Sequence, residues 1–205
     1  MGAPTLRFER QAWREGAVIV AGVDEVGVGP LAGPVTGGAV ALRAGRRFSW
    51  FKDVRDSKVL SASRREELAA RIVETVPATT ASVSNEEIDR IGILPARRLC
   101  MMRAIEKLPE CPDFVISDAL DLPVPRLRAV IRGDALSVAV AAASVVAKVD
   151  RDALMRRLSE EFPAYNFARH KGYPTPEHRR LLREFGPCPI HRRSFNPVSQ
   201  MVLPL

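Results

Sequence analysis

The chain has 205 residues, which is long enough for one domain with a single large core. Hydrophobic residues make up 46% of it, so the composition is that of a globular protein and excludes a disordered chain. Lys and Arg number 31 against 24 Asp and Glu, and the resulting net charge of +7 indicates a polyanionic partner.

The sequence predicts no membrane segment and no secretion signal. Its longest apolar run, residues 135–147, is about thirteen residues long, whereas a membrane span needs roughly twenty, so we expect a buried helix. The N-terminus carries Glu9 and Glu15 and lacks the apolar stretch of a secretory signal. The three cysteines show no paired spacing, which predicts reduced thiols and a cytoplasmic protein.

The N-terminal half of the chain predicts strands followed by a helix. β-Branched and aromatic apolar runs indicate strands over residues 17–23, 35–42 and 46–51. A polar loop over residues 55–61 comes next. Ser63 and Glu66 then have the spacing of a capping box, which predicts a helix that extends to Val76.

The C-terminal half alternates strands with helices. Strands are predicted over residues 78–83, 113–117 and 128–132. Helices are predicted over residues 84–92, 95–108, 137–162 and 175–185. This order predicts the α/β class, with a mixed sheet, helices packed on its faces and a helical C-terminal extension.

The stretch AGVDEVGVGPLAGPVTGG, residues 21–38, places glycines directly after two acids. Gly27, Gly29 and Gly33 are spaced one residue too far apart for a dinucleotide fingerprint, and a strand follows them where that fingerprint needs a helix. The sequence therefore argues against a nucleotide-binding loop. Two interpretations remain: a glycine backbone that approaches a ligand closely, or a tight turn between two strands.

Four acids lie at or near the ends of predicted strands: Asp24, Glu25, Asp118 and Asp134. Ligands gather at strand ends in sheet proteins, so we expect these acids to lie together if the first strand ends or kinks at Asp24. Four close carboxylates need a cation, and oxygen ligands select Mg²⁺ or Mn²⁺, which are suited to phosphodiester hydrolysis. The spacing alone leaves open that the acids are solvated turn residues or caps.

Positive charge is concentrated near the C-terminus. Residues 165–193 contain seven Lys or Arg against two Glu, together with all three histidines. We interpret this segment as a phosphate-binding surface that includes Arg169 and Lys171. The alternative is an ordinary solvated face in an Arg-rich chain.

Six blocks of the sequence, taken together and in this order, carry a resemblance to a known family: AGVDEVGVGPLAGPV, DSKVLS, EEIDRIGIL, AAASVVAKVDRD, ARHKGYPTPEH and GPCPIHRRSFNPV. They resemble the successive signature blocks of bacterial type 2 ribonuclease H, the ribonuclease HII family. The resemblance implies a ribonuclease H-like mixed sheet flanked by helices, with a catalytic domain over residues 1–163 and a basic helical segment over residues 164–205 packed on it. It also implies an endonuclease that cuts the RNA strand of RNA–DNA hybrids. Single ribonucleotides in duplex DNA would be cut on their 5′ side, leaving a 3′-hydroxyl and a 5′-phosphate.

The resemblance also implies roles for individual residues. The metal-binding acids would be Asp24, Glu25, Asp118 and Asp134, with Mn²⁺ or Mg²⁺ as the cofactor. The substrate-binding residues would be Gly27, Val28 and Gly29 at the ribose, Tyr173 stacked near the ribonucleotide, and Lys58 near the backbone. Asp150 and Asp152 lie in a family block, but we interpret them as helix residues outside the metal set.

Three positions depart from the family pattern. The family usually reads Gly-Arg-Gly where this chain has Val28 between its glycines; Val59 replaces a Lys, and Arg97 replaces a Thr. The main chain at Val28 can still recognise a 2′-hydroxyl. Val28 cannot make the charged phosphate contact of an Arg, however, a loss of about 1.5–3 kcal/mol.

We therefore expect a cytoplasmic, monomeric ribonuclease HII that acts on RNA–DNA hybrids and on ribonucleotide-containing duplex DNA. Two alternatives remain open. Val28 raises the possibility of a hybrid-binding protein with weakened catalysis, although the four acids argue against it. A related metal nuclease that acts on DNA, such as a junction resolvase, is disfavoured by the ribose-sensing blocks.

Overall fold

The chain is built around a mixed sheet, as shown by a computed structural model that describes residues 3–54 and 60–201. The five strands are β1 (Ile19–Val26), β2 (Val35–Arg43), β3 (Ala78–Val83), β4 (Phe114–Asp118) and β5 (Leu127–Val130). Their order across the sheet is β3-β2-β1-β4-β5. Pairing is antiparallel from β3 to β1 and parallel from β1 to β5. The predicted α/β class with a mixed sheet is confirmed.

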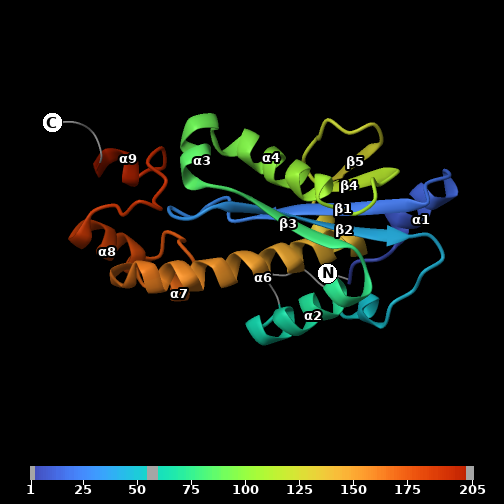
Figure 1. The fold of residues 1–205 in the computed structure, drawn as a ribbon, viewed down its shortest axis with the longest axis horizontal. Helices are drawn as coiled ribbons and strands as arrows, with labels where there is room; N and C mark the ends of the chain where they lie inside the picture. The colour runs from blue at the N-terminus through green and yellow to red at the C-terminus, as the bar shows by residue number, and fades with distance from the viewer. Residues whose placement is uncertain (1–2, 55–59, 202–205) are drawn as a thin grey trace.

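Helices cover both faces of this sheet (Figure 1). The α-helices are α1 (Arg7–Arg14), α2 (Ala62–Thr75), α3 (Asn85–Ile91), α4 (Ile93–Glu106), α5 (Gly133–Leu136), α6 (Val138–Glu161), α7 (Phe167–His170), α8 (Pro176–Phe185) and α9 (Val198–Met201). Helix α6, with α2 outside it, packs on one face and α4 on the other, while α7, α8 and α9 lie beyond one end of the sheet. Within the described ranges, no helix is long and apolar enough to cross a membrane.

Two adjacent glycines of β2 let a helix lie directly against each face of the sheet. A Cβ atom added at Gly38 would lie 2.4 Å from the carbonyl oxygen of Ala143 on α6. One added at Gly37 would lie 2.5 Å from the carbonyl carbon of Cys100 on α4. Contacts this close exclude any side chain at either position. Both helices therefore approach the middle of the sheet closely enough to present their own side chains beside β1.

The strand predicted over residues 46–51 is wrong. This segment contains a short 3₁₀ helix, η1 (Ser49–Lys52), and Trp50 is buried in the core beneath α2 with its indole N–H donating to Thr75 Oγ1 at 2.9 Å. The physical reason lies in the sheet. Strand β2 already pairs with β1 on one side and β3 on the other, so a hairpin partner has no free edge to join.

The start of helix α2 also differs from the prediction. Ser61, and not Ser63, is the N-cap, and its hydroxyl accepts the Arg64 N–H at 3.2 Å. Glu66 does not close a capping box; its carboxylate pairs with Arg156 of α6 at 3.0 Å. The helix begins two residues earlier than predicted because Ser61, with an extended backbone at ψ 157°, already accepts a hydrogen bond from an N–H group at the helix end.

Candidate active site

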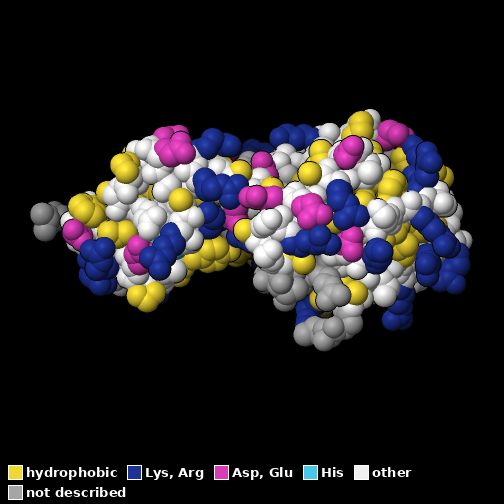
Figure 2. All heavy atoms as spheres, turned by 90° about the horizontal axis from the view of Figure 1, so that it is seen from below, with side chains coloured by type: hydrophobic (Ala, Val, Ile, Leu, Met, Phe, Trp, Pro, Cys, Tyr) yellow, Lys and Arg dark blue, Asp and Glu magenta, His cyan; other side chains and the backbone are white. Residues whose placement is uncertain are grey.

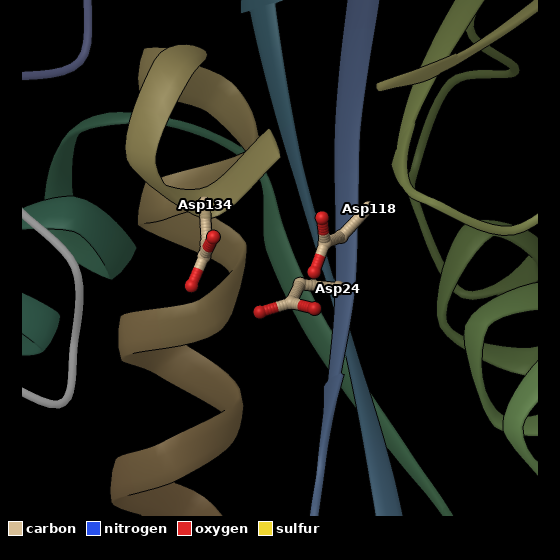
Figure 3. A group of neighbouring side chains, drawn as sticks. All are labelled: Asp24, Asp118 and Asp134. Atoms are coloured by element: carbon tan, nitrogen blue, oxygen red, sulfur yellow. The ribbon is translucent and has the colours of Figure 1, made fainter. Parts of the chain in front are cut away.

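Three aspartates from separate elements bring their carboxylates together. In the parallel pair of β1 and β4, Val23 lies opposite Ser117, so the next residues, Asp24 and Asp118, stand at the same level. Asp134 reaches them from the short helix α5. One oxygen of each of the three carboxylates lies within 4.8 Å of the others. Figure 3 shows the three side chains side by side between β1 and the helices. The predicted gathering of acids is thus present for these three.

The chain after β5 is shaped to place Asp134. Arg132 has a left-handed backbone, with φ at 62°, and turns the chain from β5 into α5. The N–H of Gly133 then donates to Asp118 Oδ1 at 2.7 Å, which fixes one carboxylate and the start of α5 together. Ser137 caps the long helix α6 directly afterwards. A hydrogen bond to the backbone therefore sets the spacing of two of the three acids.

Asp24 is buried and surrounded by like charges. Its carboxylate accepts the Glu25 N–H at 2.8 Å and a hydrogen bond from the hydroxyl of Ser144 on α6. Burial, followed by the neighbouring carboxylates, raises the pKa of Asp24 well above its ordinary value. The side chain is thus held in one orientation, at a position where its negative charge needs a compensating cation.

Glu25 does not join the aspartates in the predicted way. Strand β1 neither ends nor kinks after Asp24 but pairs with β2 up to Val26, so consecutive side chains point to opposite faces. Asp24 faces α6, and Glu25 lies on the α4 side, where Arg97 binds it. The Nε and Nη2 atoms of Arg97 lie 2.7 and 2.6 Å from Glu25 Oε1. The expectation that the strand stops between the two acids is therefore wrong.

The second oxygen of Glu25 is left without a partner. Its side chain is only 5% exposed, and Oε2 is buried with no hydrogen-bond partner among the described residues. Burial raises the pKa of Glu25 to about 7, although the charge of Arg97 and its hydrogen bond lower it in part. A buried, orphaned carboxylate oxygen is costly unless a ligand completes it.

The donor set fits a hard divalent cation. All of its atoms are carboxylate oxygens, the cluster of three aspartates carries mutually repelling charges, and Glu25 Oε2 nearby lacks a partner. Oxygen ligands of this kind select Mg²⁺ or Mn²⁺ over zinc. Asp150 and Asp152 have other partners, Thr80 Oγ1 at 2.9 Å and Lys148 Nζ at 2.6 Å.

A cleft of about 320 Å³ opens above the acids. Besides the four acids, its lining includes Gly27, Val28, Gly29, Arg97, Ser144, Lys148 and Tyr173. The glycine loop, the metal-type carboxylates and the predicted stacking tyrosine therefore share one cavity. Only the family resemblance predicted that the glycine loop, the acids and Tyr173 lie together.

The glycine loop is held from behind by a buried arginine. Arg192 donates to the carbonyl oxygens of Gly27, Val28 and Gly33 at 2.7, 2.9 and 2.9 Å. The Val28 side chain is half-buried beside an apolar cluster made of Val35, Val83, Ile88, Ala96 and Cys100. The hydrogen bonds from Arg192 thus fix the backbone of the loop in the cleft. The residue between its first two glycines, Val28, has no charged side chain.

Tyr173 stands next to this loop. Its side chain is 38% exposed, and the Arg151 guanidinium lies 5.9 Å from the centre of its ring. The preceding residue, Gly172, packs on the glycine loop and accepts the Leu31 N–H at 2.8 Å. The C-terminal segment therefore presents an aromatic ring to the cleft. The stacking of this ring near a ribonucleotide stays a prediction.

The predicted basic surface is only partly a surface. Arg169 is exposed and pairs with Glu177 at 3.3 Å, and Lys171 is half-buried with its Nζ bound to the Ala168 carbonyl oxygen. Arg192 and the three histidines are buried, so that part of the prediction is wrong. Figure 2 shows Lys and Arg mixed with Asp and Glu at both ends of the face seen from below. Lys58 lies outside the described residues.

Several residues of the site were not predicted to belong to it. Arg97 was noted only as a departure from a family pattern, and Arg192 only as one basic residue among many. Ser144 had a usable signal, since it interrupts an apolar run and lies four residues before Lys148, on the same face of α6. No local signal in the sequence indicated Arg192, because the carbonyl groups that it binds precede it by 159 to 165 residues.

The sequence matches the family model described as Ribonuclease HII over residues 21–198. The chain belongs to the ribonuclease HII family. Two relatives support this: ribonuclease HII of Myxococcus xanthus (strain DK1622) is 47% identical over 95% of the chain and 67% of the relative. That of Dehalococcoides mccartyi (strain BAV1) is 44% identical over 97% of the chain and 95% of the relative.

A solved structure has the same architecture as this ribonuclease HII. The crystal structure of ribonuclease H2 from Pyrococcus horikoshii OT3 is similar with a TM-score of 0.75 and 26% identity, over 89% of this chain and 96% of that one. The ribonuclease H-like fold is therefore confirmed, as is the endoribonuclease activity on RNA–DNA hybrids. The alternative of a catalytically weakened hybrid-binding protein gains no support.

Proposed function

We propose that Asp24, Glu25, Asp118 and Asp134 are the catalytic metal ligands of this ribonuclease HII, with Mn²⁺ or Mg²⁺ as the cation. The observation that carries this proposal is the convergence of three carboxylates within 4.8 Å, beside a fourth whose Oε2 has no partner among the described residues. Its substrates are the RNA strand of hybrids and single ribonucleotides in duplex DNA, cut on the 5′ side to leave a 3′-hydroxyl and a 5′-phosphate.

The cation, when bound, activates water for attack on phosphorus and stabilises charge on the departing 3′-oxygen. The contribution of the protein is orientation. Ser144 and the Glu25 N–H fix the Asp24 carboxylate, and the Gly133 N–H fixes that of Asp118. Arg97 holds Oε1 of Glu25 and leaves Oε2 for the cation. The ligand oxygens are therefore arranged before the substrate arrives, which lowers the reorganisation needed for reaction.

Recognition of the ribonucleotide falls to other residues that line the cleft. We propose that the main chain of Gly27, Val28 and Gly29 contacts the ribose 2′-hydroxyl, and that Tyr173 stacks beside that nucleotide. The rigid hold of Arg192 on this loop supports the first role, and the exposed ring at the rim supports the second. Arg169 and Lys171, on the same segment as Tyr173, and Lys58 bind the nucleic-acid backbone in this proposal.

The division into a catalytic domain over residues 1–163 and a basic segment over residues 164–205 is part of the same proposal. We propose that the monomer is the active form. We propose that this monomer works in the cytoplasm, where ribonucleotide-containing DNA arises during replication.

Cleavage of a labelled DNA duplex that contains one ribonucleotide tests the proposed function. In Mn²⁺, the wild-type protein should cut once, on the 5′ side of the ribonucleotide. Asp24→Asn should lose at least about a thousandfold in rate, since a bound cation supplies several kcal/mol of transition-state stabilisation and each 1.4 kcal/mol is tenfold. The matched control is Asp150→Asn, an exposed acid of α6 outside the cleft, which should cut normally.

Three results of this assay would contradict the proposal: equal rates for wild type and Asp24→Asn, cleavage of an all-DNA duplex, or a cut on the 3′ side. Cleavage of the all-DNA duplex would point to the DNA nuclease considered as an alternative.

A further inference from the structure

Arg97 reaches into the cleft from the face of the sheet opposite the three aspartates. Its side chain is 25% exposed, and it lines the same cavity as the residues of the glycine loop. The resolved contacts of its guanidinium with Glu25 run from Nε and Nη2 to a single carboxylate oxygen, Oε1. The Nε and Nη2 side of the guanidinium is thus bound to Glu25, while part of the side chain is exposed to the cleft.

The donor count of the guanidinium leaves capacity for a second partner. An arginine carries five N–H groups in a planar fork, and the two contacts with Glu25 Oε1 occupy two of them. Among the described residues no further partner takes the Nη1 group or the second Nη2 hydrogen, so both are available to an anion. A planar fork of this kind suits the paired oxygens of a phosphate.

Arg97 is one of two basic residues among the described lining of the cleft. The other, Lys148, is bound to Asp152 at 2.6 Å. The glycine loop adds no positive charge, because the Val28 side chain packs beside an apolar cluster and the carbonyls of the loop are bound to Arg192. The positive charge that a nucleic-acid backbone would contact in the cleft is therefore that of Arg97 on α4.

Two of the three departures from the family pattern lie in this one cavity. Position 28 holds Val where an Arg is usual, and position 97 holds Arg where a Thr is usual; both residues line the cleft. We propose that Arg97 binds a backbone phosphate of the substrate and supplies from α4 the charge that the loop at Val28 lacks. This inference rests on the proposed function, since it assumes that nucleic acid occupies the cleft.

Binding without turnover tests it, with every protein carrying Asp24→Asn so that the substrate stays intact. Affinity for a fluorescent duplex with one ribonucleotide is measured by anisotropy over a range of salt concentrations. Arg97→Thr should bind about 10- to 100-fold more weakly than the parent. Its salt dependence, as the slope of log K against log salt, should be shallower by about one.

Val28→Arg in the Arg97→Thr background should regain most of the lost affinity and restore the slope. The matched control is Arg98→Thr, the next residue of α4, whose Nε donates to the Asp121 carbonyl oxygen outside the cleft; it should bind like the parent. Arg97→Gln keeps a hydrogen-bond donor toward Glu25 but no charge. If Arg97→Thr does not fold, the same loss of slope in Arg97→Gln carries the test.

A purely structural role for Arg97 gives a different result. In that case Arg97→Thr, made with Asp24 intact, weakens Mn²⁺ binding measured by calorimetry. In the Asp24→Asn proteins it leaves the salt slope of duplex binding unchanged and is not rescued by Val28→Arg. This combination overturns the inference. Unchanged affinity and slope in Arg97→Thr also overturn it. A parent that does not bind the ribonucleotide-containing duplex counts against the proposed function itself, which separates the two failures.

Discussion

Asp24 and Glu25 are neighbours in sequence, yet they meet different surroundings. The alternation of β1 directs Asp24 to the cluster of aspartates beside α6 and Glu25 to Arg97 of α4. Both carboxyl groups have a raised pKa for the same first cause, which is burial. In the metal-free protein they therefore hold protons at a pH where exposed acids are ionised, and a cation has to displace those protons.

Mn²⁺ binding should consequently release protons and strengthen as the pH rises. The pKa of Glu25 is raised to about 7, so below that pH the protonated form dominates and competes with the cation; above it the competition disappears. Calorimetric titration at pH 6.5 in two buffers of different ionisation enthalpy should give at least about one proton released per ion, since the pKa values of Asp24 and Glu25 are both raised. Glu25→Gln should release fewer. Identical heats in both buffers would show that the acids are already ionised.

The sequence identified the acids but not the way they are shared between the two faces of the sheet. Their residue types and their places near strand ends were enough to predict a metal site. The extent of β1 up to Val26 depends on its pairing with β2, and the partner of Glu25 lies 72 residues along the chain. Such long-range contacts leave no local pattern in the sequence, so Arg97 could be noticed only as an unusual residue.

At the scale of elements, the site depends on how closely two helices approach the sheet. Gly38 pairs with Asp24 and admits α6 on its face, and Gly37 pairs with Glu25 and admits α4 on the other. Ser144 and Arg97 are brought to the acids by these two close contacts. Packing at the middle of β2 is therefore a condition for the electrostatics of the site.

Gly38→Ala should destabilise the protein by roughly 1–3 kcal/mol, because its new methyl group would overlap the α6 backbone and force the helix outward. The matched control is Gly29→Ala, where an added Cβ has no atom within 4 Å and φ is not positive; its effect should stay within about 0.5 kcal/mol. Urea unfolding of the metal-free proteins measures both. Equal stability of the two variants would mean that α6 does not press on the sheet at this point.

Local signals predicted elements well where the deciding contacts are local. The helices predicted over residues 84–92 and 175–185 are present as α3 and α8; Ser84 and Glu87 form a capping box at the start of α3, and Thr175 caps α8. The segment over residues 46–51 shows the opposite case. Its aromatic and apolar residues favour a strand, but β2 already pairs along both of its edges. Trp50 is instead buried in the core beneath α2.

At the scale of the whole molecule, two buried arginines join the C-terminal segment to the sheet. Arg192 binds the glycine loop, and Arg151 of α6 donates to the carbonyl oxygens of Pro34 and Lys171, at 2.9 and 3.1 Å. No carboxylate of the described ranges pairs with either one, and burial lowers the pKa of Arg192 to about 9. The segment over residues 164–205 thus shapes the cleft from within, and its separate status as a domain stays a prediction.

Arg192→Leu should loosen the glycine loop and destabilise the fold by roughly 3 kcal/mol or more, since three carbonyl groups lose a charged donor and such bonds contribute about 1.5–3 kcal/mol. Hydrogen exchange of the loop, residues 27–33, should accelerate, and the KM for the ribonucleotide-containing duplex should rise. The matched control is the exposed neighbour: Arg193→Leu should change neither the hydrogen exchange of the loop nor the KM. An unaltered loop in Arg192→Leu would refute the role assigned to this arginine.

The proposed catalysis depends on a divalent cation that the four acids hold in the cleft. Anomalous diffraction from crystals grown with saturating Mn²⁺ tests it most directly. We expect a peak among Asp24, Asp118 and Asp134, about 2.1 Å from at least two of their oxygens, with Glu25 Oε2 turned toward it. A map with no peak at the three aspartates, or with Mn²⁺ held only elsewhere on the protein, would contradict it.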